Sequence, residues 1–172
     1  MAVLKDSGER REFGTGAVRD MAKGKGRCDL LPLRIVTGMF QSDCIPGNDP
    51  VLDALWFFDD DGRSDTAYLY DALRGLCDRA FRGDKADMML QLSQHMEDGA
   101  KKYGENNWQK GIPVRAYLDS ALRHYFKWLR YDDDEPHHRA CAWNLMCMIW
   151  ELDHHPDQSI YEEKNYDTGT EN

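Results

Sequence analysis

Carboxylates, histidines and amides are concentrated between residues 97 and 144, in a pattern suited to metal-dependent phosphate chemistry. The candidate groups are Glu97, Asp119, His124, Asp134, His137 and Asn144. Such chemistry needs hard oxygen ligands on rigid elements, with cations nearby to bind phosphates. His137 and Asn144 are seven residues apart, so they share one face of a helix. The spacing permits a carboxylate cage, but Asp119 and Arg123, four residues apart, can instead form an ion pair.

A polar segment within the same region, KKYGENNWQKG, has the residue types of a nucleotide contact. Its lysines can meet phosphate oxygens, its amides can bind a base edge and its aromatic rings can stack on a base. The candidates for substrate binding are Lys101, Lys102, Tyr103, Asn107, Trp108 and Lys110. The alternative is an ordered loop for which Trp108 serves only as an anchor.

The N-terminal segment 1–34 is basic and rich in glycine, although the whole chain is acidic. Arg19, Lys25 and Arg27 are candidate phosphate contacts, because neighbouring glycines let backbone N–H groups approach an anion. The alternative is a solvated tail, since glycines without a preceding strand are a weak signal.

Several of these polar residues also have ordinary structural explanations. Asn144 stands in an apolar helical run, where it needs a hydrogen-bond partner of some kind if it is buried. The acidic run 132–135 is typical of a solvated turn. His137, His138 and Cys141 are zinc-ligand types, but a second close-spaced ligand pair is missing, so zinc is not favoured here.

The elements that position these groups are helices. Apolar periodicity predicts helices over 66–82, 86–99, about 114–131 and about 136–152, with Asp65 as an N-cap and Pro136 in the first turn of the last helix. Antiparallel packing of the last two helices would place Asp119 and His124 opposite Asn144. The acidic turn 132–135 would then lie near the end of the preceding helix.

We therefore expect an all-α helical bundle with an irregular N-terminal arm. The expected divisions are an arm over 1–34, an insertion with one helix over 35–85, a catalytic helical core over 86–155 and a loose polar tail over 156–172. An aromatic cluster in the insertion, Trp56-Phe57-Phe58, suits an interface between copies and suggests a homodimer or homotetramer.

Composition limits the class of protein. A chain of 172 residues with net charge −9 is expected to be a single domain and not a general binder of nucleic acid polymers. It has no apolar run long enough for a membrane span and no secretory signal at residue 1. Five cysteines without a CxxC motif indicate reduced thiols. We expect a cytoplasmic protein.

Three segments resemble a known family when they are taken together. SGERREFGTGAVRDMAKGKGRCDLLPL, EDGAKKYGENNWQKGIPVRAYLDSALRHYFKW and HHRACAWNL are similar to the phage dATP/dGTP diphosphohydrolases, also called MazZ-type proteins. The resemblance implies a fold of the MazG-like nucleotide pyrophosphohydrolase type. It implies hydrolysis of a purine deoxynucleoside triphosphate to the monophosphate and pyrophosphate with Mg²⁺ or Mn²⁺. The setting would be a phage that remodels the purine pool in the host cytoplasm.

The resemblance also implies roles for individual residues. Glu97 would bind metal and orient the attacking water, with His124 as a second catalytic group. Asp119, Asp134, His137 and Asn144 would complete the metal site, and Arg123 with the arm's Arg19, Lys25 and Arg27 would contact substrate.

The chain departs from the usual MazG-like pairing of ExxE and ExxD motifs. Cys141 to Asn144 stand where ExxD is expected, and Pro136 interrupts the acids. These departures support an alternative function, in which a phage protein sequesters nucleotides without cleaving them.

Overall fold

The computed structural model describes residues 10–20, 28–33, 35–36 and 49–156. This range holds five α-helices, two short 3₁₀ helices and a two-stranded antiparallel hairpin. The elements are β1 (Arg10–Glu12), β2 (Val18–Asp20), η1 (Cys28–Leu30), α2 (Pro50–Asp60), α3 (Thr66–Ala80), α4 (Lys85–Tyr103), η2 (Asn107–Lys110), α5 (Val114–Leu129) and α6 (His137–His154). The all-α prediction is confirmed. The predicted contacts Lys25 and Arg27, and the predicted tail beyond 156, lie outside the described residues.

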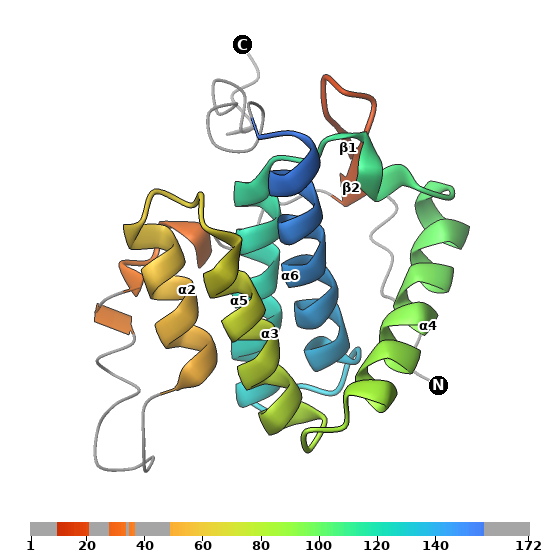
Figure 1. The fold of residues 1–172 in the computed structure, drawn as a ribbon. Coiled ribbons are helices and arrows are strands. Elements are labelled where there is room, and N and C mark those ends of the chain that lie inside the picture. The colour runs from red at the N-terminus through yellow and green to blue at the C-terminus, as the bar shows by residue number, and fades with distance from the viewer. Residues whose placement is uncertain (1–9, 21–27, 34, 37–48, 157–172) are drawn as a thin grey trace.

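Helix α6 is central, because it packs against α3, α4 and α5. Helix α2 packs on α3 at one side of the bundle, whereas α4 lies at the opposite side (Figure 1). The hairpin lies near η2 at one end of α4 (Figure 1). Of the described helices, α4 packs chiefly against α6.

The core follows the predicted apolar stripes of α5 and α6. Leu118, Leu122, Tyr125, Leu145 and Met148 are fully buried. Helices α5 and α6 are joined by the short turn 130–136, and they pack against each other more extensively than any other two described helices. Burial of these side chains, each contributing about 1.5–3 kcal/mol, fixes the two helices that bear most candidate site residues.

The segment 35–85 contains two helices, α2 and α3, instead of the one predicted. Asp49 caps α2 by accepting hydrogen bonds from the backbone N–H groups of Val51 and Leu52, both at 3.1 Å, and Pro50 occupies the first turn. Asp49 and Pro50 therefore start a helix that was not among those predicted. Phe58 is fully buried, so this part of the aromatic cluster belongs to the core and not to an interface.

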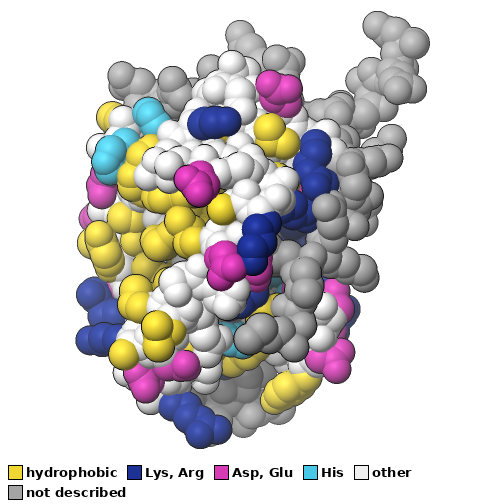
Figure 2. Space-filling model, turned by 90° about the vertical axis from the view of Figure 1, so that its right-hand side faces the viewer, with side chains coloured by type: hydrophobic (Ala, Val, Ile, Leu, Met, Phe, Trp, Pro, Cys, Tyr) yellow, Lys and Arg dark blue, Asp and Glu magenta, His cyan; other side chains and the backbone are white. Residues whose placement is uncertain are grey.

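Helix α4 is one turn longer than predicted, ending at Tyr103 before the positive-φ residue Gly104. Met88 and Leu92 are buried, as expected, but Met89 is 54 % exposed and Leu90 is 70 % exposed. Apolar side chains therefore reach the surface on α4, and the face of the molecule shown in Figure 2 mixes apolar and charged groups.

Two further features concern the cysteines and the hydrophobicity of the helices. Cys28, Cys77, Cys141 and Cys147 are free thiols. In the described part of the chain, no helix combines the length and hydrophobicity that a membrane span requires.

Candidate functional site

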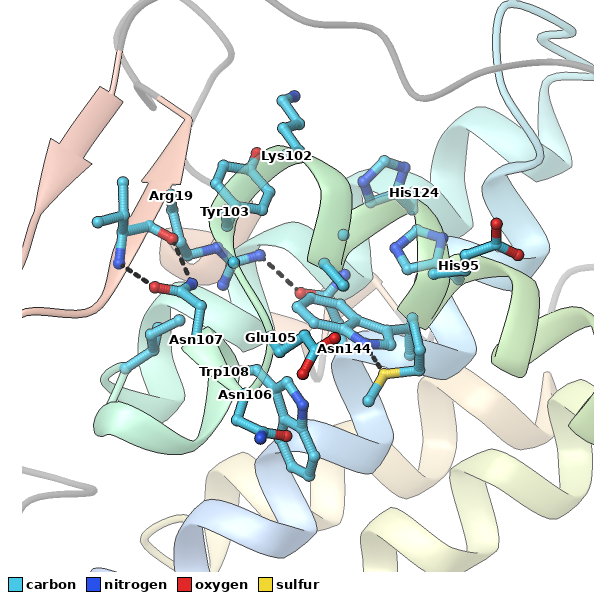
Figure 3. A pocket seen from close by; sticks show the side chains of 18 residues that line it. Arg19, His95, Lys102, Tyr103, Glu105, Asn106, Asn107, Trp108, His124 and Asn144 are labelled. Atoms are coloured by element: carbon cyan, nitrogen blue, oxygen red, sulfur yellow. Dashed lines mark hydrogen bonds between the residues drawn. The ribbon is translucent and has the colours of Figure 1, made fainter.

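A cavity of about 440 Å³ lies between α4 and the α5–α6 pair. Strand β2 and helix η2 close it, so segments far apart in the sequence contribute its walls (Figure 3). Its polar and aromatic lining includes Arg19, His95, Tyr103, Asn107, Trp108, His124, Trp143 and Asn144. The volume falls in the range of small-molecule sites, which are mostly apolar with a few placed polar groups.

Three contacts between α4 and α6 hold one wall of the cavity. Arg139 Nη2 donates to Asp98 Oδ2 at 3.1 Å. The indole Nε1–H of Trp143 points at the sulfur of Met96 at 2.9 Å. His138 Nε2 of α6 is also hydrogen-bonded to Gln91 Oε1 of α4, at 2.9 Å. These contacts fix the spacing of α4 from α6.

The hairpin closes the cavity through side-chain contacts with η2 and α4. The Asn107 side chain pairs with the peptide groups of Val18, accepting from N–H at 2.9 Å and donating to C=O at 2.8 Å. Asp20 accepts from Lys102 Nζ at 2.9 Å and from the Tyr103 hydroxyl at 2.8 Å. Asn107, Lys102 and Tyr103, predicted as substrate contacts, thus all bind the hairpin as well as lining the cavity.

Arg19 reaches from β2 to both α5 and α6. Its Nη2 donates to Asn144 Oδ1 at 2.8 Å and to Ser120 Oγ at 3.1 Å. Its guanidinium lies 4.7 Å from the centre of the Tyr117 ring. Arg19 Nη1 is buried and has no hydrogen-bond partner among the residues that the structure describes. Arg19 is therefore held in a fixed orientation by its contacts with α5 and α6.

The cavity wall carries a neutral histidine. His95 is 6 % exposed and its ring centroid lies 5.2 Å from that of Trp143. Burial, together with the positive charges of Arg139 and Arg19, lowers the pKa of His95 to about 3. Its Nδ1 is buried without a partner in the described part of the chain. His95 is thus an uncharged hydrogen-bonding group at neutral pH.

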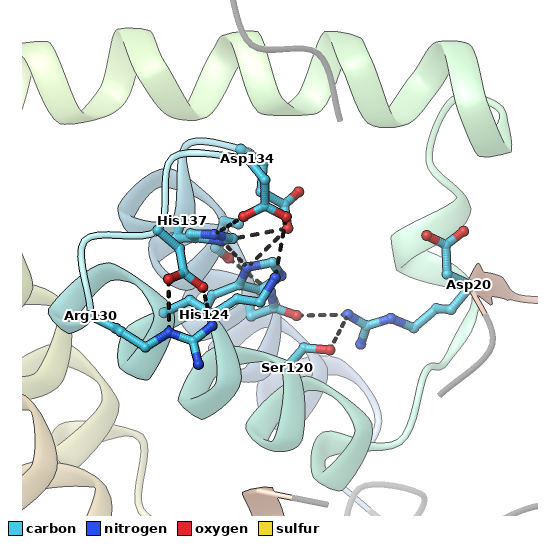
Figure 4. A network of polar contacts seen from close by, with 12 residues as sticks. Asp20, Ser120, His124, Arg130, Asp134 and His137 are labelled. Carbon is cyan, nitrogen blue, oxygen red and sulfur yellow. Dashed lines mark hydrogen bonds and ion pairs between the residues drawn. The ribbon is translucent and has the colours of Figure 1, made fainter. Parts of the chain in front are cut away.

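A histidine–carboxylate cluster borders the cavity where α5 turns into α6 (Figure 4). His124 Nδ1 lies 3.0 Å from His137 Nδ1, and Glu135 Oε1 lies 3.5 Å from both nitrogens. His137 Nε2 is 2.7 Å from Asp134 Oδ1. Burial, followed by the proximity of His137, holds the pKa of His124 well below its usual range. His124 belongs to both the cluster and the cavity lining, and so connects them.

The structure brings only some of the predicted metal ligands together. His137 and Asp134 are in contact, but Asn144 is instead hydrogen-bonded to Arg19 and to the Ala140 carbonyl oxygen. His124 faces His137 and not Asn144, contrary to the sequence-based placement.

The two remaining predicted carboxylates lie outside the cluster. Asp119 is buried and pairs with Arg123, and it also accepts from the Cys28 backbone N–H at 2.6 Å. Glu97 is exposed and pairs with Lys101, so its carboxylate does not join the other candidate ligands. Both pairs have the spacing of ordinary i,i+4 ion pairs, an alternative that the sequence analysis gave for Asp119 and Arg123 but not for Glu97 and Lys101.

The other predicted substrate contacts divide between the cavity and the surface. Trp108 lines the cavity and packs edge-on against Trp150 at 5.1 Å between ring centres. Lys110 is exposed at the end of η2 and does not contribute to the lining. Arg123 faces Asp119. The predicted loop therefore contributes aromatic side chains to the cavity wall. Of its lysines, Lys102 lines the cavity, whereas Lys101 and Lys110 are exposed.

Sequence reasoning missed His95, Trp143 and Glu135 as members of the site. His95 had one available signal, since it is a polar residue within the spacing of the apolar stripe of α4. Glu135 was treated as part of a solvated acidic turn. Its 12 % side-chain exposure distinguishes it from Asp133, which is exposed in the same turn.

Fold and site together define an all-α protein with a ligand-sized cavity beside a histidine–carboxylate cluster. The family model described as "dATP/dGTP diphosphohydrolase, N-terminal" matches residues 70–160, more than half of the chain. The chain belongs to that family, which confirms the predicted relationship and a bundle of the MazG-like type. No curated protein and no solved structure matches the chain. The matched range includes α4, α5 and α6, whereas the hairpin with Arg19 lies outside it.

Proposed function

We propose that this protein hydrolyses purine deoxynucleoside triphosphates, dATP or dGTP, to the monophosphate and pyrophosphate. The description of its family supports this activity. The observation that carries the proposal is the continuity of the site: His124 lines the 440 Å³ cavity and is also part of the histidine–carboxylate cluster. A nucleotide with its base in the cavity would have its phosphates near groups that can bind a cation.

The cavity lining suits a nucleoside. Trp108, Trp143 and Tyr103 provide aromatic surface, and a base stacked on such a ring gains about 1–3 kcal/mol. Arg19 and His95 are polar side chains in the cavity lining, and we propose that they contact base or phosphate atoms. Both groups are held in place by neighbouring rings, so little conformational freedom is lost on binding.

We propose that the reaction uses Mg²⁺ or Mn²⁺ that arrives with the triphosphate, and the residues beside the cavity suit a divalent cation as well. Asp132, Asp134 and His137 form one group, and His124, Glu135 and His137 form another, whose ligand atoms lie close enough to share one ion. Bound there, an ion would neutralise phosphate charge and lower the pKa of a coordinated water. Asp134 orients His137 and Glu135 supplies an oxygen ligand that is largely shielded from solvent.

We further propose a homo-oligomer that remodels purine pools for a phage in the host cytoplasm. Phe57 is 47 % exposed and stacks on Trp56 at 4.8 Å between ring centres, so apolar surface remains for a contact between copies. Sedimentation at micromolar concentration is expected to give a dimer or tetramer. A single species of the monomer mass would exclude this part of the proposal.

The activity is tested with a panel of dNTPs and NTPs, with and without Mg²⁺ or Mn²⁺, and the products are separated by ion-exchange chromatography. We expect a purine deoxynucleoside monophosphate and pyrophosphate only when metal is present. Arg19→Met should raise the KM for the triphosphate at least 10-fold, whereas Arg74→Met, the same change on the exposed side of α3, should leave it unaltered. Nucleotide recovered intact from the protein after desalting would instead identify a sequestering protein.

A further inference from the structure

We infer that His124, His137 and Glu135 form a binding site for a first-row transition-metal ion of the Zn²⁺ or Co²⁺ class, and not a Mg²⁺ site. The inference rests on the proposed function only for what the ion does there. Binding of the ion is independent of turnover and can be measured without nucleotide.

The three ligand atoms have the spacing of a tetrahedral site. His124 Nδ1, His137 Nδ1 and Glu135 Oε1 form a triangle with sides of 3.0, 3.5 and 3.5 Å. The circle through the corners of this triangle has a radius of ~1.9 Å, so an ion slightly out of its plane lies ~2.0–2.1 Å from all three. Zn–N and Zn–O bonds in proteins have this length.

The contacts of His137 agree with metal binding. Its Nε2 lies 2.7 Å from Asp134 Oδ1, the distance of a hydrogen bond in which Nε2–H donates to the carboxylate. In that tautomer Nδ1 carries the lone pair, and Nδ1 is one corner of the triangle. A carboxylate that holds a histidine in this way is the usual support of a ligand histidine.

The three ligand side chains are shielded from solvent, and their types and number decide which ion binds and whether a further ligand can join it. The His137 side chain is fully buried, and those of His124 and Glu135 are 18 % and 12 % exposed. Three protein ligands leave a fourth position for water or substrate, as in catalytic zinc sites. Two imidazole nitrogens favour transition metals, whereas Mg²⁺ prefers oxygen ligands in an octahedron.

The second group of candidate ligands, Asp132, Asp134 and His137, fits an ion less well. Asp132 is paired with Arg130, whose Nε lies 2.8 Å from Oδ1, so its oxygens are occupied. Asp134 is close enough to His137 Nε2 to accept its proton. Asp134 therefore supports His137 of the first group, and the second group does not form a site of its own.

The test is titration of the chelator-treated, full-length protein with Co²⁺, followed by visible absorption. We expect one equivalent to give the intense d–d bands of a four- or five-coordinate site, stoichiometric Zn²⁺ to remove them, and a large excess of Mg²⁺ to leave them. Asp134→Asn should weaken binding by about 10–100-fold. Glu135→Gln and His124→Gln, which remove ligands, should weaken it further, whereas Asp133→Asn, the same charge change in the same turn, should not.

Four outcomes would overturn the inference. The first is wild-type protein that gives no Co²⁺ bands, and the second is bands that Mg²⁺ removes as readily as Zn²⁺ does. The third is bands that remain unchanged in Glu135→Gln and His124→Gln. Each of these would leave only a hydrogen bond between two histidines. Cleavage of nucleotides by protein that binds no Co²⁺ or Zn²⁺ would also refute it, while the proposed function would stand. Tight Co²⁺ binding without any cleavage supports the metal site and removes the proposed function.

Discussion

Replacing His95 by glutamine should make the stability of the protein less dependent on pH. In the folded chain the pKa of His95 is lowered from 6.5 to about 3, first by burial and then by the charges of Arg139 and Arg19. The unfolded chain therefore binds one more proton than the folded chain between these two values. Acidification in this window favours the unfolded state, so His95 stabilises the fold fully only above about pH 6.5.

The size of the effect follows from this difference in proton binding. Lowering the pH from 7 to 5 should cost the wild-type protein ~2 kcal/mol through His95 alone, because each pH unit below 6.5 contributes ~1.4 kcal/mol. Other groups that titrate, including His124, change the total but remain in the variant. The difference between wild type and His95→Gln isolates the one residue.

Urea unfolding at pH 7 and pH 5 measures this difference for wild type, His95→Gln and the control His154→Gln. His154 is exposed at the end of α6, so its replacement should retain the wild-type pH dependence. We expect His95→Gln to lose ~2 kcal/mol less than the wild type over this range. Equal losses in both would show that His95 is not held as a buried neutral ring, and the description of the cavity wall would be wrong.

Three further substitutions test the packing that positions the site, each by thermal and urea unfolding. Asp49→Ala should cost ~3–5 kcal/mol, because it strands the Tyr125 hydroxyl, 2.9 Å away, and removes a helix cap; no loss would contradict this role. Gly75→Ala should cost ~1–3 kcal/mol, since the new Cβ would stand 3.0 Å from Pro50 Cβ; a stabilised variant would show that the helices can separate. Asn107→Ala should cost ~2 kcal/mol and make the hairpin sensitive to trypsin at Arg10; wild-type resistance would refute this attachment.

The helices were predictable where local signals agreed. Periodic apolar residues predicted α3, α5 and α6, and Asp65 does cap α3, accepting from the Ala67 backbone N–H at 2.8 Å. Helix α2 was missed because Asp49-Pro50 has the composition of a turn as well as that of a helix start. The contacts that fix Asp49 come from residues 30 and 76 positions away, which no local pattern reveals.

The sequence predicted which regions of the chain contribute to the site, but not which side chains pair with one another. The pattern predicted functional groups between residues 97 and 144, a range that holds His124, Asp134 and His137, and it predicted Arg19 separately in the arm. His95, which also lines the cavity, lies outside both predicted regions. The prediction failed for Asp119, whose pairing with Cys28 spans 91 residues, and for Glu97, whose partner Lys101 was considered only as a phosphate contact. The sequence around a carboxylate does not show whether a cation or an N–H group pairs with it, because tertiary packing determines which groups lie beside it.

Most of the cavity lining lies within the matched range and the hairpin contributes to it from outside, which has a consequence for specificity. The histidine–carboxylate cluster lies wholly in the α5–α6 region, within the matched range 70–160. Arg19 enters from the hairpin outside that range and is held by Asn144 and Ser120. Under the proposed function, the hairpin can therefore contribute to ligand recognition without belonging to the cluster. Substitutions in the hairpin should alter which ligand binds, and substitutions around His137 should alter which ion binds. Substitution of His124, which lines the cavity and belongs to the cluster, should affect both.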